Sequence, residues 1–346
     1  MLRAGALGDL VFALPALDAL RDAYPDAEIV LLGKPWMAEL LCERPSPVDR
    51  VVPVPVARGV GAPADAVEDA RALDAFFAAM RDLRFDLALQ LHGGGRHSNP
   101  FVLKLRARVT AGMRAADAPA LDRTMPYVYQ QNERLRLLEA VALVGAIPVT
   151  LAPRLAVTPR DLAEADAVVP PSAAPLVVLQ PGSSDARRRW PPEQFALLGD
   201  ALVTAGAVVA INGTRDEADL VRTIHGAMQR EAIDLAGRLS LAGLAGLLSR
   251  ARVVVSNDTG PLFLAEAVGA ATVGIFWLTN LAMDGSLFRT RHRYALATRV
   301  ACPVCGRLQI DERCEHDPSF VAEVTVDEVL APALELLASD ATFRRK

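Results

Sequence analysis

The sequence predicts an α/β protein with two doubly wound parallel sheets, one in each half of the chain. In both halves, short apolar runs alternate with helical patterns, which is typical of parallel sheets. The stretch 253–276 has the pattern strand, polar turn, helix, strand. A segment rich in Pro, Ala and Ser, residues 157–175, separates the two halves and has the composition of a linker. We therefore expect two domains.

The composition is that of a globular protein with enough apolar material for two cores. Hydrophobic residues make up 52% of the 346 residues and charged residues 23%, close to the usual balance. The net charge of −4 argues against nucleic acid as a partner. No apolar run reaches the roughly 18 residues of a membrane-spanning helix, and polar residues interrupt the apolar amino terminus, which argues against a signal peptide. We expect a cytoplasmic protein.

The first half begins with a strand stub at Met1–Arg3, followed by a loop of small residues. Asp9 caps a helix that runs to about Tyr24, and leucines at helical spacing along it are expected in the core. Pro15 predicts a bend in that helix. The strands and helices that follow alternate and are expected at Glu28–Leu32, Pro35–Leu41, Val51–Val54, Ala66–Arg81 and Leu87–Leu91.

The second half repeats the alternation after residue 175. Ser240 is expected to cap one helix, and Thr325 with Glu328 forms a capping box that opens the last helix, to about Ala338. The remaining elements are expected at Leu176–Gln180, Pro192–Ala205, Ala207–Ile211, Glu217–Gln229, Ile233–Leu235, Leu241–Ser249, Val253–Val255, Leu262–Val268 and Thr272–Phe276.

Two turns that follow strands in the second half suit a phosphate group. Asp258–Gly260 lies where a strand ends and a helix begins, so free backbone N–H groups and the positive end of the helix dipole meet there. Ser183–Ser184 follows another strand and precedes Arg187–Arg189, whose guanidinium groups can hold a diphosphate. The simpler alternatives are helix capping at the first turn and a solvated loop at the second.

Two further clusters carry polar groups. A glycine-rich segment after the strand at Leu87–Leu91 offers His92, Arg96 and Asn99 at the strand edge where ligands bind in open α/β sheets; a plain flexible loop is the alternative. Near the carboxyl terminus, three cysteines and a histidine have the donor types and number of a structural zinc site, with ordinary reduced thiols as the alternative: Cys302, Cys305, Cys314 and His316.

Taken together, four stretches resemble glycosyltransferase family 9, the lipopolysaccharide heptosyltransferases. They are GDLVFALPAL at 8–17, PGSS with RRRWPPEQF at 181–195, GTRDE at 213–217 and SNDTGPLFLAEAVG at 256–269. The resemblance implies a GT-B fold, with two Rossmann-like domains facing a cleft. It places an acceptor domain at 1–160, a linker at 161–175, a nucleotide-sugar domain at 176–324 and, at 325–346, a helix that packs back toward the first domain.

The resemblance also implies an inverting, metal-independent transfer that needs no cofactor. Asp9 matches the family's aspartate that serves as catalytic base, a role suited to a carboxylate that takes the acceptor hydroxyl's proton. The sugar, heptose-like, would come from a nucleoside diphosphate such as ADP and pass to lipopolysaccharide or another glycan acceptor, with peripheral contact to the inner membrane face. Donor contacts fall on Ser183, Ser184, Arg188, Glu217, Asp258, Thr259 and Gly260, and acceptor contacts on Gly8, His92, Arg96 and Asn99.

The sequence departs from the family pattern at two site positions. Phe263 stands where a histidine usually follows the DTG motif, and Arg188 stands where a lysine is usual. Two alternatives therefore stay open, a nucleotide-sugar epimerase of the same fold and a catalytically inactive nucleotide-binding protein. A nicotinamide dehydrogenase fits least, because the first turn lacks a full G-x-G-x-x-G.

Overall fold

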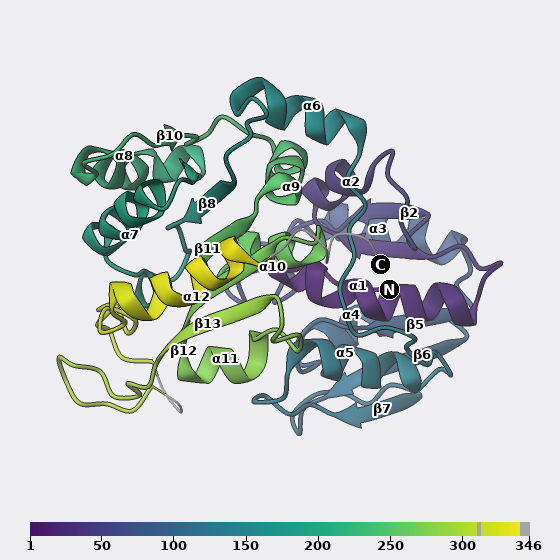
Figure 1. Ribbon diagram of the computed structural model, residues 1–346. Coiled ribbons are helices and arrows are strands. Elements are labelled where there is room, and N and C mark those ends of the chain that lie inside the picture. The colour runs from purple at the N-terminus through teal and green to yellow at the C-terminus, as the bar shows by residue number, and fades with distance from the viewer. Residues whose placement is uncertain (310–312, 340–346) are drawn as a thin grey trace. The chain divides into compact units, whose positions relative to one another are not determined.

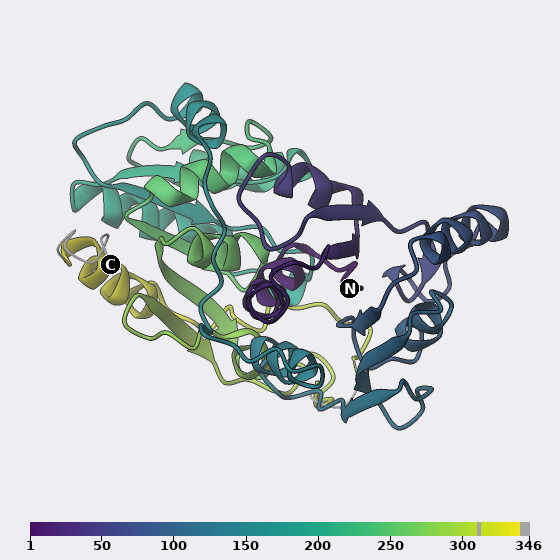
Figure 2. The same ribbon diagram turned by 90° about the vertical axis from the view of Figure 1, so that its right-hand side faces the viewer.

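A computed structural model describes residues 1–309 and 313–339. The chain divides into two compact units, Met1–Ala156 and Val157–Lys346, which Figure 1 and Figure 2 show from two directions. Each unit is built on parallel strands joined through helices, so the predicted α/β class is confirmed.

The amino-terminal stub is the centre of the first unit. Leu2 forms parallel bridges with Leu32 and Gln90, and it thereby joins a two-stranded sheet to a three-stranded one. Backbone hydrogen bonds of 2.8 Å, from Leu2 N to Leu89 O and from Leu32 N to Met1 O, hold it in place. The two sheets consist of β1 (Val30–Gly33) with β2 (Arg50–Pro53), and β5 (Leu87–Gln90) with β6 (Val109–Arg114) and β7 (Arg123–Pro126).

The helices of this unit bury apolar residues against these strands. Helix α1 contains Pro15 and, as predicted, buries the leucines spaced along it. Helix α1 spans Leu7–Ala23. The other elements of the first unit are α2 (Pro35–Leu41), the short strands β3 (Ala57–Arg58) and β4 (Gly61–Ala62), α3 (Ala70–Asp82), α4 (Ser98–Leu103) and α5 (Glu133–Ala142). Because α4 begins at Ser98, the glycine-rich segment that follows β5 is already helical at Asn99.

The second unit contains a six-stranded parallel sheet in the order β10-β9-β8-β11-β12-β13. From the central strand β8 the chain winds outward on one side to β10, then returns and winds outward on the other side from β11 to β13. The order therefore reverses between β8 and β11, which places the topological switch point there. The strands are β8 (Leu176–Gln180), β9 (Val208–Ile211), β10 (Ile233–Asp234), β11 (Val253–Asn257), β12 (Ala271–Trp277) and β13 (His292–Ala297).

Helices cover both faces of this sheet (Figure 1). The helix α7 contacts α8 and α12, and α9 contacts α10 and α6. The cap of α9 by Ser240 and the capping box of α12 are both formed as predicted. The helices are α6 (Pro159–Val168), α7 (Pro192–Thr204), α8 (Ala218–Ala227), α9 (Leu241–Arg250), α10 (Gly260–Ala267), α11 (Leu278–Asp284) and α12 (Val326–Ala338), with short 3₁₀ turns η1 (Ala186–Arg188) and η2 (Arg215–Glu217).

Two predictions about the domain edges need correction. The segment 161–175, expected as a linker, contains most of α6, which packs on α9 of the second unit. The last helix, expected to pack toward the first domain, instead buries Val329, Ala333 and Leu336 in the core of the second unit. Apolar spacing predicted the helix but not its partner, because an apolar stripe does not say which surface it covers.

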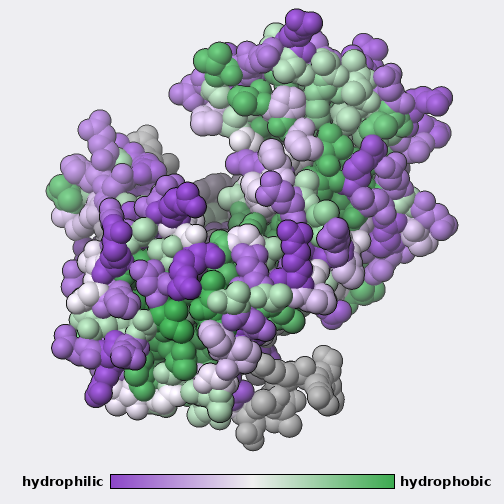
Figure 3. Space-filling view, turned by 90° about the horizontal axis from the view of Figure 1, so that it is seen from above, coloured by the Kyte–Doolittle hydropathy of each residue, from purple (hydrophilic) through white to green (hydrophobic). Residues whose placement is uncertain are grey.

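Hydrophilic residues cover most of the face drawn in Figure 3, and smaller apolar areas lie between them. Among the described residues, every helix is too short or too polar to span a membrane.

Candidate functional site

The switch point of the second sheet carries the two loops that the sequence singled out. Ser256 of β11 pairs in register with Gln180 at the end of β8, so the loops that follow both strands leave from the same edge. Asn257, at the end of β11, binds both sides of the first loop. Its Nδ2 donates to Pro181 O at 2.6 Å, and its Oδ1 accepts from Trp190 N at 3.1 Å. Asn257 belongs to the SND motif, but the motif alone does not indicate that this residue anchors the neighbouring loop.

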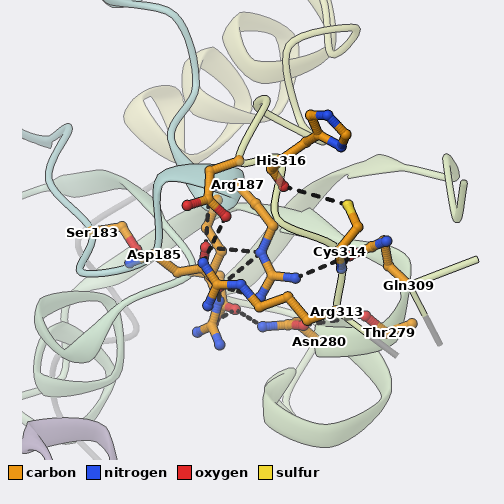
Figure 4. Close-up of polar contacts among 12 residues, drawn as sticks. Ser183, Asp185, Arg187, Thr279, Asn280, Gln309, Arg313, Cys314 and His316 are labelled. Atoms are coloured by element: carbon orange, nitrogen blue, oxygen red, sulfur yellow. Dashed lines mark hydrogen bonds and ion pairs between the residues drawn. The ribbon is translucent and has the colours of Figure 1, made fainter. Parts of the chain in front are cut away.

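Arg188 and Asp258 form the central ion pair of this edge. Arg188 Nη1 lies 3.2 Å from Asp258 Oδ2, and Asn280 of α11 donates to the same oxygen at 2.6 Å (Figure 4). Asp258 is 1% exposed, and its Oδ1 has no hydrogen-bond partner among the described residues. Burial raises the pKa of Asp258, and the nearby Arg188 guanidinium and Asn280 amide oppose that shift. Asp258 therefore orients Arg188, and a direct contact with a diphosphate would bring two anions together.

The other two arginines of the run, Arg187 and Arg189, form hydrogen bonds within the loop itself. Arg187 Nε and Nη2 donate to the two carboxylate oxygens of Asp185 at 3.0 and 2.6 Å. Burial would raise the pKa of Asp185, but these hydrogen bonds outweigh it and lower the pKa. Arg189 Nε donates to Ser183 O at 2.8 Å. Arg188, whose side chain is 33% exposed, is therefore the arginine of this loop that is best placed to meet a phosphate.

The two serines of this loop differ. Ser183 is buried, and its Oγ accepts from Asp185 N at 3.3 Å, so it shapes the turn. Ser184 is exposed.

The second turn has the features of an anion site rather than of a simple cap. Thr259 is the N-cap residue of α10 but makes no capping hydrogen bond through its side chain. Asp258 is engaged with Arg188, as described above, and does not cap the helix either. The helix begins at Gly260, with Pro261 in its first turn. The hydroxyl of Thr259 and the backbone N–H of Gly260 are thus placed to donate to an anion, whereas Pro261 has no N–H and Leu262 N donates to Thr259 O at 3.0 Å.

Glu217 reaches the same edge from the loop after β9. Its carboxylate accepts from Thr214 N at 2.8 Å and lies directly against Gly182, where any Cβ would overlap it. Gly182 is thus needed for this close approach.

In the first unit, Asp9 lies in the first turn of α1 with its carboxylate held at both oxygens. Arg3 Nη2 donates to Oδ1 at 2.7 Å, and Ala6 N donates to Oδ2 at 2.6 Å. Arg3 is 2% exposed and also bonds Glu133 at 2.8 Å and Leu91 O at 2.6 Å. The Asp9 side chain nevertheless remains 39% exposed. A buried arginine thus fixes the orientation of an accessible carboxylate, and no motif in the sequence indicates this role of Arg3.

His92 follows β5 and lies within electrostatic range of Arg3 and Asp9. Its pKa falls from 6.5 to about 4, first because burial disfavours the charged ring and then because Arg3 repels it, although Asp9 acts in the opposite sense. His92 is therefore neutral near pH 7. Gly8, which directly precedes Asp9 in the chain, is buried at the start of α1.

This shift predicts a pH dependence of stability. Between pH 6.5 and about 4 the unfolded chain binds a proton at His92 that the folded chain does not. The free energy of unfolding should therefore fall as pH decreases through that window, by at most about 3 kcal/mol from this group. Urea unfolding at several pH values should show a shallower loss in His92→Gln than in the wild type, and His97→Gln, an exposed neighbour, serves as control. Equal slopes for all three proteins would contradict the assignment.

The other two predicted acceptor residues lie in different settings. Arg96 is exposed and pairs with Asp117. Asn99 is completely buried, and its amide donates to Met113 O at 3.2 Å and Pro119 O at 2.8 Å. The prediction that Asn99 contacts an acceptor is therefore wrong. Asn99 instead ties the segment after β5 to the backbone at Met113 and Pro119. The residue type alone does not distinguish this structural role from ligand binding.

The four predicted metal ligands come together near the carboxyl terminus. The sulfur atoms of the three cysteines and a ring nitrogen of His316 lie within 4.8 Å of one another, and the cysteines are free thiols. Val304 N donates to Cys302 Sγ at 3.4 Å. Gly306 has φ +72°, which favours glycine and lets the chain turn back so that Ala301 pairs with Leu308. Three thiols and one imidazole match the four tetrahedral ligands that structural zinc takes.

Comparison with known proteins gives consistent results. A family model described as glycosyltransferase family 9 (heptosyltransferase) matches residues 74–288. Lipopolysaccharide heptosyltransferase 1 of Pseudomonas aeruginosa is 24% identical over 336 residues, covering 92% of this chain and 88% of that protein. A family 9 glycosyl transferase structure from Veillonella parvula superposes with a TM-score of 0.77 at 17% identity, covering 96% of this chain and 95% of the other. The structure of E. coli heptosyltransferase WaaC with ADP gives 0.69 at 20% identity, covering 97% and 98%.

These comparisons decide among the alternatives left open by the sequence. The fold is GT-B, as in the solved structures of the family, and family membership favours a transferase over an epimerase or an inactive binding protein. Phe263, the residue that motivated the inactive alternative, is buried within α10. The chain belongs to glycosyltransferase family 9, the heptosyltransferases, and is a glycosyltransferase.

Proposed function

We propose that this glycosyltransferase moves a heptose, with inversion and without a catalytic metal, from ADP-heptose to an acceptor sugar of the lipopolysaccharide core. The observation that carries the donor half is Arg188, held by Asp258 at the switch point beside the start of α10. Relatives support the donor and acceptor classes, since one is named a lipopolysaccharide heptosyltransferase and one structure contains ADP.

The reaction follows from the chemistry of these groups. Asp9 takes the proton of the acceptor hydroxyl as its oxygen attacks the anomeric carbon. The bond from that carbon to the diphosphate breaks with its electron pair, so ADP leaves with an added negative charge. Arg188 and the N-terminus of α10 stabilise that growing charge without a metal ion. Glu217, at the same edge, binds the ribose through its carboxylate, and Thr259 and Ser184 donate hydroxyl groups.

We assign the acceptor to the first unit. Gly8 and His92 accompany Asp9, and Arg96 lines a cavity of about 240 Å³ together with Arg58 and Lys104. Glu68 lines the same cavity beside Arg58, and Arg96 pairs with Asp117. Three cations and one carboxylate still leave the lining positive, which favours an acceptor that carries negative charge. A lipid-linked acceptor of this kind places the enzyme at the cytoplasmic face of the inner membrane, held by peripheral contact.

We further propose that the Cys302, Cys305, Cys314 and His316 cluster holds a structural zinc ion, which takes no part in the transfer. Such a site would clamp a long connection that has little secondary structure of its own. Purified protein should contain about one zinc per chain by elemental analysis, as expected for a four-ligand site. Cys305→Ser should lose it, whereas Cys42→Ser, which changes an exposed cysteine of the first unit, should retain it. Metal-free wild-type protein after purification with added zinc would contradict the proposal.

The donor assignment is tested by nucleotide binding followed by transfer. A panel of ADP, UDP, GDP and CDP should show stabilisation of the zinc-loaded protein by ADP alone in thermal unfolding, with no added divalent cation needed. With ADP-heptose and a heptose-free lipopolysaccharide core, mass spectrometry should detect an acceptor heavier by one heptose. Binding of a different nucleoside diphosphate would mean that the donor carries that base instead of adenine. Release of free heptose as the main product would argue against transfer.

A further inference from the structure

We propose that metal bound at the cysteine–histidine cluster sets the position of the arginine loop, so that metal occupancy and binding of the donor diphosphate are thermodynamically coupled. This inference rests on the donor site proposed above and assigns it a control element. The cluster and Arg188 belong to the same unit and are connected through a short series of contacts. Figure 4 shows Asp185, Arg187, Gln309 and Cys314 of this series.

The side chain of Gln309 forms the first link. Its Oε1 accepts from the backbone N of Cys314, a metal-ligand residue, at 3.3 Å, and from Arg187 Nη1 at 3.4 Å. Gln309 is 9% exposed, and its own backbone N donates to Val300 O at 2.9 Å. One buried amide oxygen thus joins the metal cluster to the arginine loop.

The second link runs from Arg187 to the phosphate-facing residue. Arg187 holds Asp185 through two hydrogen bonds, and Asp185 Oδ2 lies 3.9 Å from Arg188 Nε. Arg188 in turn pairs with Asp258 at 3.2 Å. A shift of Arg187 therefore moves the carboxylate on one side of Arg188, while Asp258 holds the other side.

Backbone contacts fix the same loop from the chain that follows the cluster. Phe320 N donates to Arg187 O at 2.8 Å, and Ser319 Oγ donates to Arg189 O at 2.6 Å. The Arg187 guanidinium also lies 5.5 Å from the centre of the Trp277 ring, which packs on Phe320 at 4.5 Å. The arginine loop therefore packs against the segment that carries the metal ligands and the residues directly after it.

The metal would add to the buried contacts of Cys302, Cys314 and Phe320, because the segment has little regular structure of its own. Among the described residues 298–325, regular structure is limited to the Ala301–Leu308 bridge, and Cys305 and His316 are exposed. Four metal–ligand bonds would order this segment before the nucleotide binds, so the nucleotide would not have to do so. Loss of the metal should weaken ADP binding without changing any residue that touches ADP.

The experiment measures both directions of the coupling. Calorimetry of ADP binding to zinc-loaded and chelator-stripped protein should give a ratio of affinities between about 5 and 150, the usual range for coupled sites. Chelator competition with and without saturating ADP should give the same ratio for zinc affinity, because coupling is reciprocal. A ratio of one in either direction overturns the inference. Absence of ADP binding to the loaded protein would instead overturn the proposed donor as well.

A pair of variants keeps the test valid if the stripped protein unfolds. Gln309→Ala removes the shared oxygen while leaving all four ligands, so it should bind zinc fully and ADP several-fold more weakly. Gln309→Glu retains an acceptor oxygen and should restore most of the ADP affinity. Gln229→Ala, at an exposed position of the same unit, should leave both affinities unchanged. If zinc-loaded Gln309→Ala binds ADP as the wild type does, the proposed link is wrong.

Discussion

Asp9→Asn is expected to lower the turnover number by about 100- to 10,000-fold, the range usual for loss of a general base, while ADP affinity stays unchanged. An asparagine side chain is nearly the same size, and its oxygen still accepts a hydrogen bond from Ala6 N. It cannot take a proton from the acceptor hydroxyl. Steady-state kinetics with ADP-heptose, together with calorimetry of ADP, separates the loss of chemistry from any loss of donor binding.

The fold should survive this substitution because Arg3 keeps a second carboxylate. Glu133 lies 2.8 Å from the same guanidinium nitrogen, so the buried cation remains paired. We expect a stability loss of about 1 kcal/mol, similar to loss of a helix-terminal interaction. Asp22→Asn, on the exposed side of the same helix, is the matched control and should keep full activity. If Asp9→Asn turns over at the wild-type rate, Asp9 is not the base.

The sequence predicts those parts of the fold that are determined by interactions between residues close together in the chain. Strand–helix alternation and caps such as Ser240 act within a few residues, so the predicted elements of the second half lie close to the observed ones, while α11 and β13 were not predicted. The packing partner of α12 is set by surfaces far away in sequence, and it was predicted wrongly. Residues 310–312 and 340–346, which include the end of the predicted carboxyl-terminal segment, lie outside the described residues.

The site shows the same division. Motifs identified Arg188, Asp258 and the four metal ligands because their residue types are unusual in those turns. Arg3 and Asn280 carry no such signal, because their importance comes from contacts with residues 6 and 22 positions away. The environment of Asn99 is also not predictable from sequence, because an asparagine in a glycine-rich segment looks the same whether its amide faces a ligand or the backbone.

Arg188→Ala is expected to lower kcat/KM by about 100- to 1,000-fold, as for removal of a group that stabilises charge in the transition state, and to weaken ADP binding. Arg188→Lys should recover part of this loss, because it keeps the charge but not the two-pronged geometry of the guanidinium. Arg222→Ala, at an exposed position of α8, is the control and should match the wild type. Kinetics and ADP calorimetry on the three variants provide the measurement, and full activity of Arg188→Ala would remove Arg188 from the donor site.

Arg188→Ala should also change the stability of the protein, because Arg188 is the ion-pair partner of the buried Asp258. Without Arg188, the buried Asp258 loses the cation that opposes the effect of burial, so its pKa rises further. A carboxyl whose pKa is raised on folding keeps its proton longer in the folded state, so stability is lost as pH increases above the ordinary carboxyl value near 4. The stability deficit of Arg188→Ala should therefore grow from pH 5 to pH 8 in urea unfolding. The double variant Arg188→Ala/Asp258→Asn should abolish that pH dependence yet still bind ADP poorly, because the cation that meets the diphosphate is still missing. Recovery of ADP binding in the double variant would mean that Asp258, rather than the missing guanidinium, had been repelling the nucleotide.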